Sequence, residues 1–295
     1  MKKNTKKKKR KVINILIIIF LVAGLLVLLF PFAQFAISDF RATRAVVEYN
    51  DDYKKMEDKQ IKNEWAEAKA YNKALNRGNF SNAFTSGNAD LKDNYENVLN
   101  VDQDGMMGYI QIPKINVDLP IFHDTNASSL DKGVGHVRGT YLPIGGKGTH
   151  SVLSAHTGLK SSVLFTNLKD LTLGDEFYIT VLDKKMAYKV DKITVVLPED
   201  ISQIQSVDGK DYVTLVTCTP YGINSHRLLV RGIRVPYTEK EIANKIKNTK
   251  HEITWMTKVF IGIMAFIVII ILYAIYRHIK KKKHIVDNRR KDLGI

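Results

Sequence analysis

The chain has 295 residues but only one cysteine, Cys218, so no disulfide can form within it. It also lacks the CxxC and HExxH spacings that are typical of structural zinc sites and zinc proteases. Neither a metal nor another cofactor is therefore predicted. Acidic residues are absent from the first eleven positions, which hold eight Lys or Arg. A lone thiol and a formal charge of +15 remain to be explained.

The positive charge is concentrated at the two ends of the chain. Residues 1–11 and 277–295 together carry +14 of the formal +15, so the residues between them are nearly neutral. Each tail adjoins an apolar run, at 12–37 and 259–276, that is long enough to cross a bilayer. This distribution predicts basic flanks of two membrane spans rather than a nucleic-acid-binding surface. The lipid bilayer is a predicted partner, and nucleic acid is not.

Two spans with basic flanks predict a two-pass protein of the cell membrane, with both termini in the cytoplasm and residues 39–254 outside. A cleavable signal peptide is the alternative for the first run, and a buried core helix is the alternative for the second. The first run is longer than a signal-peptide core of about 7–15 residues, which favours a retained anchor although Ala33 and Ala36 resemble a cleavage site. Outside the cell, an unpartnered Cys218 is expected to be a reactive thiol or an intermolecular crosslink.

The part between the spans divides into a helical and a β-rich region. Helical spacing predicts one packing or stalk helix over 39–77, capped by Ser38 or Asp39. A polar loop follows at 78–100, with at most a short helix near 91–99. The predicted segments are a basic tail 1–11, a span 12–37, the helix and loop 38–100, a barrel 101–238, a juxtamembrane linker 239–258, a span 259–276 and a basic tail 277–295.

From residue 106 onward, short β-patterned runs alternate with turn residues. About eight strands are predicted, at 107–112, 117–122, 151–154, 176–182, 186–190, 193–197, 212–217 and 227–235. Few helices are expected between them. The pattern predicts one mainly β domain, a closed barrel that is either antiparallel or mixed.

Three residues next to these strands can carry acyl-transfer chemistry. Cys218 ends one strand, and a hairpin would bring Arg227 back beside it. His156 follows the strand at 151–154. A thiol needs a base or a nearby positive charge to form a thiolate, and an oxyanion needs a donor. Spacing alone leaves two questions open. Cys218 could be buried and inert, and three other histidines lie in similar contexts: His136, His150 and His226.

Four stretches resemble class C sortases, the pilus-assembling transpeptidases of Gram-positive bacteria. They are TLVTCTPYGINSHRLLVRG at 214–232, GHVRGTYLPIGG at 135–146, THSVLSAHTGL at 149–159 and LFTNL at 164–168. The resemblance covers about residues 106–235. It implies a closed eight-stranded sortase-type β-barrel with short helices, preceded by an N-terminal helix and flanked by two transmembrane helices.

The same resemblance implies Cys218 as the nucleophile, His156 as the general acid and base, and Arg227 as the group that stabilises the oxyanion or the substrate. The implied partners are pilins or other surface proteins with LPXTG-like sorting signals. A thioester on the cysteine would then be transferred to a pilin lysine amine. One alternative is a sortase that attaches surface proteins to the cell wall. An alternative of another class is a non-catalytic membrane scaffold with an inert thiol.

One departure from the class C pattern concerns the lid. Many class C sortases cover the active site with an Asp-Pro-aromatic motif, but residues 79–100 contain no proline. Since this stretch is polar, it is expected to have little to bury. The sequence therefore favours the absence of a lid, with a lid that uses other contacts as the alternative.

Overall fold

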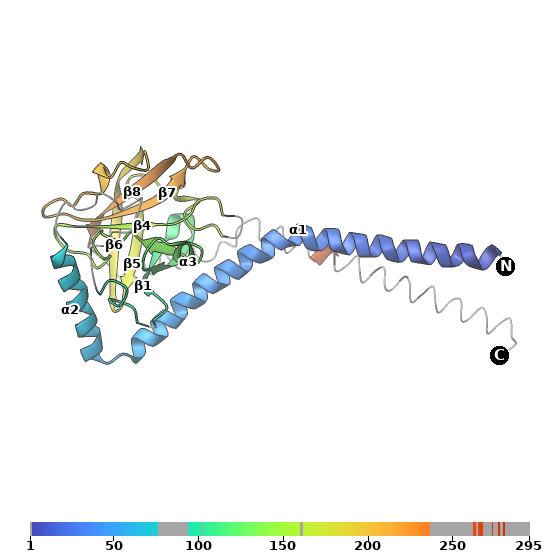
Figure 1. Cartoon of the computed structure of the whole chain (residues 1–295), viewed down its shortest axis with the longest axis horizontal. Coiled ribbons are helices and arrows are strands. Elements are labelled where there is room, and N and C mark those ends of the chain that lie inside the picture. Colours follow the sequence, from blue (N-terminus) through green and yellow to red (C-terminus); the bar gives the residue numbers. More distant parts are fainter. Residues whose placement is uncertain are drawn as a thin grey trace. The chain divides into compact units, whose positions relative to one another are not determined.

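The computed structural model describes residues 2–75, 94–101, 103–159 and 162–236, together with residues 262–263, 265–267, 273, 277 and 280. The described part of the first compact unit, Met1–Ile242, holds two long helices and a β-barrel (Figure 1). Its strands are β1 (Met106–Ile112), β2 (Val117–Phe122), β3 (Val134–His136), β4 (Thr149–Ser154), β5 (Glu176–Val181), β6 (Lys184–Val196), β7 (Asp211–Thr219) and β8 (His226–Val235). Short helices in the connections are η1 (Pro113–Ile115), α3 (Ala127–Leu130), η2 (Leu168–Asp170) and η3 (Ser202–Ile204).

The strands close into a mixed barrel in the order β1-β2-β3-β4-β7-β8-β6-β5. Two neighbouring pairs, β2 with β3 and β4 with β7, are parallel, and the other pairs are antiparallel. Closure leaves no exposed sheet edge. The prediction of a mainly β, closed eight-stranded barrel is confirmed. Of the two alternatives left open, antiparallel and mixed, the barrel is mixed.

The individual strands differ from the predicted ones in two places. The predicted strands 186–190 and 193–197 are one strand, β6, whose register shifts between Val190 and Lys192. Polar residues at this irregularity interrupt the alternation that a regular strand would show. Asp191 is held there by an ion pair to Arg231 at 2.8 Å. The sequence analysis missed β3 because a three-residue strand that contains a glycine carries almost no β signal.

The N-terminal helix α1 (Lys2–Lys55) runs without a break through the predicted N-cap. The capping prediction at Ser38 or Asp39 is therefore wrong, because both residues lie inside the helix. An N-cap requires extended dihedrals, and neither residue interrupts the helical run. Near its end, α1 packs on the barrel through Tyr49. The Tyr49 hydroxyl donates to the Met107 carbonyl at 3.2 Å, and the Leu182 N–H donates to that hydroxyl at 2.8 Å.

The helix predicted over 39–77 is in fact the end of α1 and a second helix, α2 (Asp58–Ala74). Glu57 has extended dihedrals (φ −71°, ψ 149°) and is the N-cap of α2. Its backbone N–H donates to Gln60 Oε1 at 2.9 Å, as in a capping box. The spacing of apolar residues continues across this break, so periodicity alone did not reveal it.

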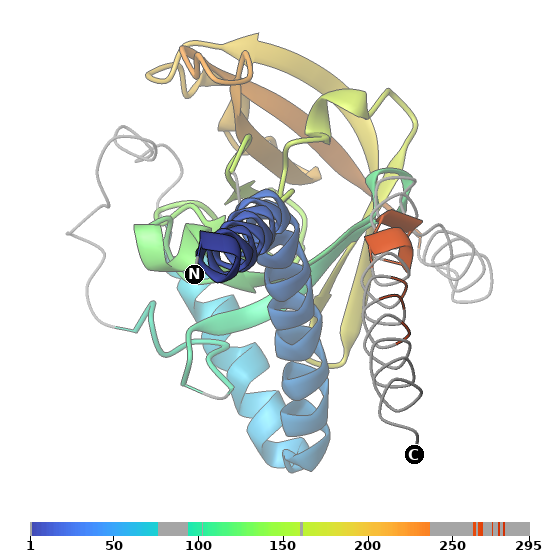
Figure 2. The ribbon, with the colours of Figure 1, turned by 90° about the vertical axis from the view of Figure 1, so that its right-hand side faces the viewer.

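The chain reverses after the break, and α2 lies against the barrel (Figure 1, Figure 2). Trp65 Nε1 donates to Asp183 Oδ1 at 2.7 Å. Asn72 exchanges two hydrogen bonds with the backbone of Leu142, at 2.8 and 3.3 Å. The buried amide therefore has backbone partners on the barrel. The interpretation of this region as a packing helix is confirmed for α2.

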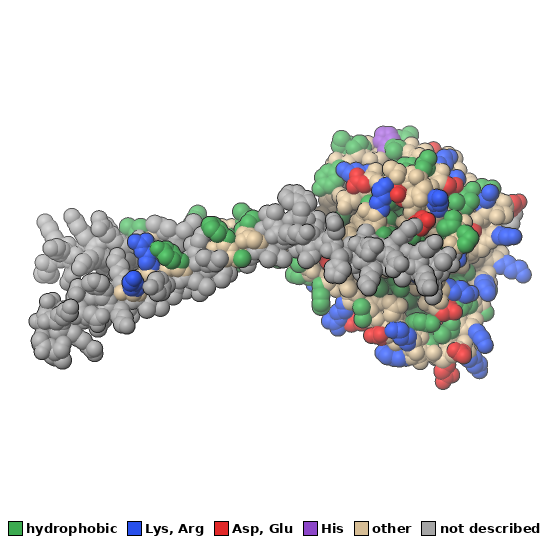
Figure 3. Space-filling model, turned by 180° about the vertical axis from the view of Figure 1, so that it is seen from behind, with side chains coloured by type: hydrophobic (Ala, Val, Ile, Leu, Met, Phe, Trp, Pro, Cys, Tyr) green, Lys and Arg blue, Asp and Glu red, His purple; other side chains and the backbone are tan. Residues whose placement is uncertain are grey.

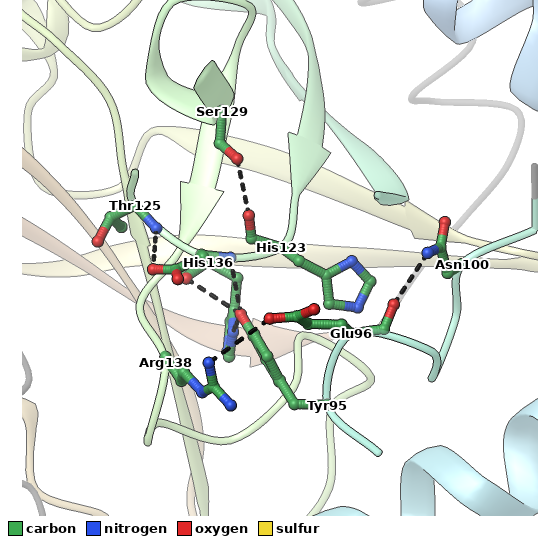
Figure 4. Close-up of polar contacts among 9 residues, drawn as sticks. Tyr95, Glu96, Asn100, His123, Thr125, Ser129, His136 and Arg138 are labelled. Atoms are coloured by element: carbon green, nitrogen blue, oxygen red, sulfur yellow. Dashed lines mark hydrogen bonds and ion pairs between the residues drawn. The ribbon is translucent and has the colours of Figure 1, made fainter. Parts of the chain in front are cut away.

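Residues 94–101 are anchored on the barrel by three buried side chains. Tyr95, Val98 and Leu99 are buried there. The Tyr95 hydroxyl lies 2.9 Å from His136 Nδ1 and accepts a bond from the Asp124 N–H at 2.9 Å (Figure 4). The expectation that this stretch has little to bury is wrong for its described end. Residues 76–93 lie outside the described residues, so the absence of a lid stays a prediction.

One helix in the described part of the chain is long and apolar enough to cross a membrane. It covers Val22–Lys55, has a mean hydropathy of 1.8 in its apolar window, and buries none of that window. It overlaps the first predicted span, 12–37. The second predicted span, 259–276, falls mostly outside the described residues.

Charges of both signs are interspersed over the barrel on the face seen in Figure 3. This agrees with the nearly neutral composition between the two basic tails. A nucleic-acid-binding face would instead gather Lys and Arg into a patch or stripe.

Candidate active site

Cys218 and Arg227 lie opposite each other in the β7–β8 hairpin. The two residues are direct cross-strand partners, so their side chains are on the same face of the sheet. This is the adjacency that the predicted hairpin requires. Cys218 is partly exposed within the described part of the chain, which argues against the alternative of a deeply buried, inert thiol.

His156 reaches the same end of the barrel from β4, which runs parallel to β7. Ser154 pairs with Val216, and the Ala155 N–H donates to the Val216 carbonyl at 3.1 Å. His156 lies two residues beyond Ser154, and Cys218 lies two residues beyond Val216 on the neighbouring strand. The structure therefore gathers the three predicted site residues at one end of three adjacent strands, β4, β7 and β8.

The segment that carries His156 is tied to the residues that follow it. The Phe165 N–H donates to the His156 carbonyl at 3.1 Å, and Phe165 is fully buried. The Gly158 N–H donates to Thr166 Oγ1 at 3.0 Å. These two bonds tie the start of the loop after β4 to its end. The backbone at His156 is therefore held by its hydrogen bond to the buried Phe165.

The turn between Cys218 and Arg227 is closed by its own backbone. The N–H groups of Ile223 and Asn224 both donate to the Pro220 carbonyl, at 3.1 and 2.9 Å. Arg227 Nη1 donates to the carbonyls of Asn224 and His226, both at 3.2 Å. These bonds use one nitrogen of the guanidinium, and the donors on Nε and Nη2 can serve a substrate oxygen.

Two histidines that competed with His156 are structural. Burial lowers the pKa of both His136 and His150 to about 4, so both rings are neutral at physiological pH. His136 Nε2 lies 2.9 Å from the Tyr141 carbonyl, and the Tyr95 hydroxyl lies at its Nδ1. For His150 the partners are the carbonyl of Gln205 and the Thr214 hydroxyl, at 2.9 and 2.7 Å. Neither ring has a nitrogen left for a substrate.

The other described histidines also lie away from the thiol. His226 pairs with Thr219 and therefore faces the opposite side of the sheet from Cys218 and Arg227. His123 is buried, and its two ring nitrogens lie 2.8 and 2.9 Å from backbone carbonyls. Among the histidines of the described ranges, His156 is thus the one that follows a strand next to β7. Sequence spacing could not make this choice.

A thiol, an imidazole and a guanidinium at one sheet end are suited to covalent acyl transfer. The thiol supplies a nucleophile, the imidazole moves protons, and the guanidinium can donate to a developing oxyanion. Groups of three or more His, Cys, Asp or Glu that could hold a metal do not occur in the part of the chain that the structure describes.

Comparison with known proteins places this arrangement in a family. The family described as the sortase domain matches residues 110–235. Sortase C1 from Streptococcus agalactiae is 45% identical, with a TM-score of 0.59, and the match covers 66% of this chain and all of that one. Sortase C of Streptococcus pneumoniae is 40% identical with a TM-score of 0.60, and the match covers 66% of this chain and 98% of that one.

A more distant relative is Sortase D of Bacillus subtilis, which is 33% identical over 131 residues. That match covers 43% of this chain and 63% of the Bacillus protein, a little under two thirds of its length. The structural relatives at 40–45% identity are class C, pilin sortases. The chain therefore belongs to the sortase family of cysteine transpeptidases, and within that family it is most like class C.

Proposed function

We propose that this protein is a membrane-anchored transpeptidase that cleaves an LPXTG-like sorting signal and joins the cleaved end to a lysine of a pilin. The observation that carries the proposal is the direct pairing of Cys218 with Arg227, beside the strand that delivers His156. The family supplies the reaction type, and the chain contains a single cysteine to serve it.

In the first half-reaction, the Cys218 sulfur attacks the carbonyl carbon of the threonine in the sorting signal. Negative charge moves onto the carbonyl oxygen, where Arg227 donates hydrogen bonds. The carbon–nitrogen bond to the next residue then breaks, and His156 gives a proton to the leaving amine. The products are a thioester on Cys218 and the released C-terminal part of the signal.

In the second half-reaction, a lysine amine attacks the thioester carbonyl. His156 takes the proton that the amine loses, and the Cys218 sulfur leaves as a thiolate. The result is an isopeptide bond between two proteins and a regenerated enzyme. No oxidant and no metal is needed for the balance of either step.

The similarity to class C structures supports a pilin as the substrate. Sortase C of group B Streptococcus is pilus-related and 42% identical to this chain. The pneumococcal sortase C has a pilin substrate specificity and is 40% identical. Sortase A of Bacillus anthracis is 30% identical. The identity of 40–42% to these pilus-related class C structures favours pilin joining.

The proposed site faces outward from a two-pass membrane protein. One apolar helix in the described residues can anchor the chain, and the basic tails at both ends favour a cytoplasmic location for each. Anchoring holds the enzyme and its membrane-bound substrates in one plane, which raises their effective concentration. Protease added to protoplasts should digest the barrel and spare tags at both termini; digestion of the C-terminal tag would exclude two spans.

The proposal is tested with the full chain in detergent micelles, a peptide containing an LPXTG-like signal, and two competing amines. One amine is a pilin fragment with its lysines, and the other is a cell-wall stem peptide. We expect the peptide to be cut and joined to the pilin fragment. Cys218→Ala and His156→Ala should abolish joining, whereas His226→Ala should retain it. Preferential joining to the stem peptide would favour the cell-wall alternative.

A further inference from the structure

The last described residue after β4 that is hydrogen-bonded to β7 is Ala155, the residue before His156. The Ala155 N–H donates to the Val216 carbonyl, and Thr217 Oγ1 donates to the Ala155 carbonyl at 2.8 Å. β4 ends at Ser154 and β7 ends at Thr219, one residue beyond Cys218, so each strand is followed by a loop. Acyl transfer nevertheless needs the imidazole and the thiol in a fixed relation, since a misplacement of 1 Å can cost about 100-fold in rate.

A contact across the two loops meets this need. The ring of Tyr221, three residues after Cys218, lies against Gly158, two residues after His156. A Cβ atom added at Gly158 would come within 2.9 Å of the Tyr221 ring, closer than real Cβ atoms approach their neighbours. Gly158 also has a φ of +74°, which side chains rarely adopt. The backbone angle therefore favours glycine, and a methyl group at this position would have to displace the ring.

Tyr221 lies in a turn that is closed by its own hydrogen bonds. The turn that carries it is closed by two hydrogen bonds onto the Pro220 carbonyl, and Arg227 bonds to the end of the same turn. On the other side, Gly158 is bonded to Thr166. The ring thus joins two loops that are each closed internally, one belonging to the thiol and one to the imidazole.

We propose that Tyr221 is a positioning residue that sets the His156 segment against the Cys218 turn through its contact with Gly158. This inference rests on the proposed function insofar as it takes His156 and Cys218 as the reacting pair. Tyr221 acts on the reaction through the backbone of the neighbouring loop, not by contact with the reacting atoms.

Because Tyr221 is exposed, its substitution should affect the reaction rate and not the stability of the core. The side chain is 66% exposed, so its removal buries or uncovers little apolar surface. Tyr221→Ala should therefore leave the melting temperature within about 2 °C of the native value. Its effect should appear in the rate instead. Tyr221→Phe keeps the ring on Gly158 and should behave as the native chain.

The test measures the kinetics of the full chain in detergent micelles with an LPXTG-containing peptide. We expect Tyr221→Ala to lower kcat about tenfold or more while KM stays within about threefold, since orientation and not binding is lost. Ile223→Ala is the matched control, because Ile223 lies in the same turn and is 72% exposed. A raised KM with an unchanged kcat would identify Tyr221 as a substrate contact and overturn the inference.

A double-mutant cycle with Gly158→Ala isolates the contact itself. The added methyl group displaces the ring in the native background but has no ring to displace in Tyr221→Ala. We therefore expect Gly158→Ala to slow turnover by a larger factor in the native background than in Tyr221→Ala. Equal factors in both backgrounds would mean that the two residues act separately, and the inference would be wrong.

The rate at which iodoacetamide alkylates Cys218 tests the positioning role without any sorting-signal peptide. A displaced His156 assists the thiol less, so Tyr221→Ala should be alkylated several-fold more slowly near pH 7 and Tyr221→Phe at the native rate. If the native chain failed to join peptides but kept this dependence, the proposed substrate would be wrong and the positioning role right. Identical alkylation and turnover in all three proteins would refute the role of Tyr221 alone.

Discussion

Acidification from pH 8 to pH 5 should destabilise the barrel through His136 and His150. Burial lowers the pKa of each ring to about 4, whereas an unfolded histidine titrates near about 6.5. Between these values the unfolded chain binds more protons than the native one, so stability falls as the pH drops through about 6.5 toward 4. At pH 5 each ring should lower the free energy of unfolding by about 2 kcal/mol, since the native ring is still mostly neutral there.

Two partly buried carboxyl groups change stability in the opposite direction. Burial raises the pKa of Glu64 and of Asp211, so the native state takes up protons more readily at these sites and gains stability on acidification. A comparison of variants over the same pH range cancels these contributions. His150→Gln suits this purpose, because an amide can donate to the Gln205 carbonyl and accept from the Thr214 hydroxyl without titrating.

The assay is thermal unfolding of the full chain in micelles at pH 8 and pH 5. The native chain should lose about 4–8 °C more than His150→Gln over this range, if each kcal/mol corresponds to about 2–4 °C in a domain of this size. His226→Gln is the control and should lose as much as the native chain, because His226 is not buried. An equally steep loss in His150→Gln would refute the argument that this ring is neutral in the fold.

Three further predictions concern Tyr95, Arg227 and the predicted absence of a lid. Tyr95→Phe removes the acceptor of the partly buried Asp124 N–H and should lower the free energy of unfolding by about 1–3 kcal/mol in thermal unfolding, with Tyr221→Phe as a neutral comparison. Arg227→Lys should slow acyl transfer about tenfold or more, because an ammonium does not reproduce the planar donor fork; a native rate would remove Arg227 from the mechanism. Deleting residues 79–93 should leave the alkylation rate of Cys218 unchanged, whereas a tenfold increase would reveal a lid worth about 1.4 kcal/mol.

The hairpin that joins Cys218 to Arg227 could be predicted from the sequence because it is local. Two β-patterned runs separated by a short stretch with Pro220 and Gly222 indicate antiparallel pairing, and the register follows from the length of the turn. The closed barrel followed from the same kind of signal, but the count of eight strands agrees only because β6 was predicted as two strands and β3 was missed. The break at Glu57 was also readable from its Glu-x-x-Gln spacing, but the helical periodicity on both sides concealed it.

The choice of His156 could not be made from local pattern. It depends on the parallel pairing of β4 with β7, in which contacts such as that of Ala155 with Thr217 join residues 62 apart. It also depends on the burial of His136, whose partner Tyr95 is 41 residues away in a stretch that reads as polar loop. Strand pairing and burial between residues so far apart cannot be predicted from the local pattern of a single sequence. The assignment of His156 therefore came from the family resemblance.

The central claim is that Cys218 carries the acyl group, and the most direct test is the mass of the intact protein. The full chain is mixed with an LPXTG-containing peptide in the absence of amine, quenched in acid and weighed. The account predicts an added mass equal to the peptide up to its threonine, lost on addition of hydroxylamine or a pilin lysine and absent from Cys218→Ala. An adduct of the same mass on Cys218→Ala, or joining of peptide to amine by that variant, would contradict it.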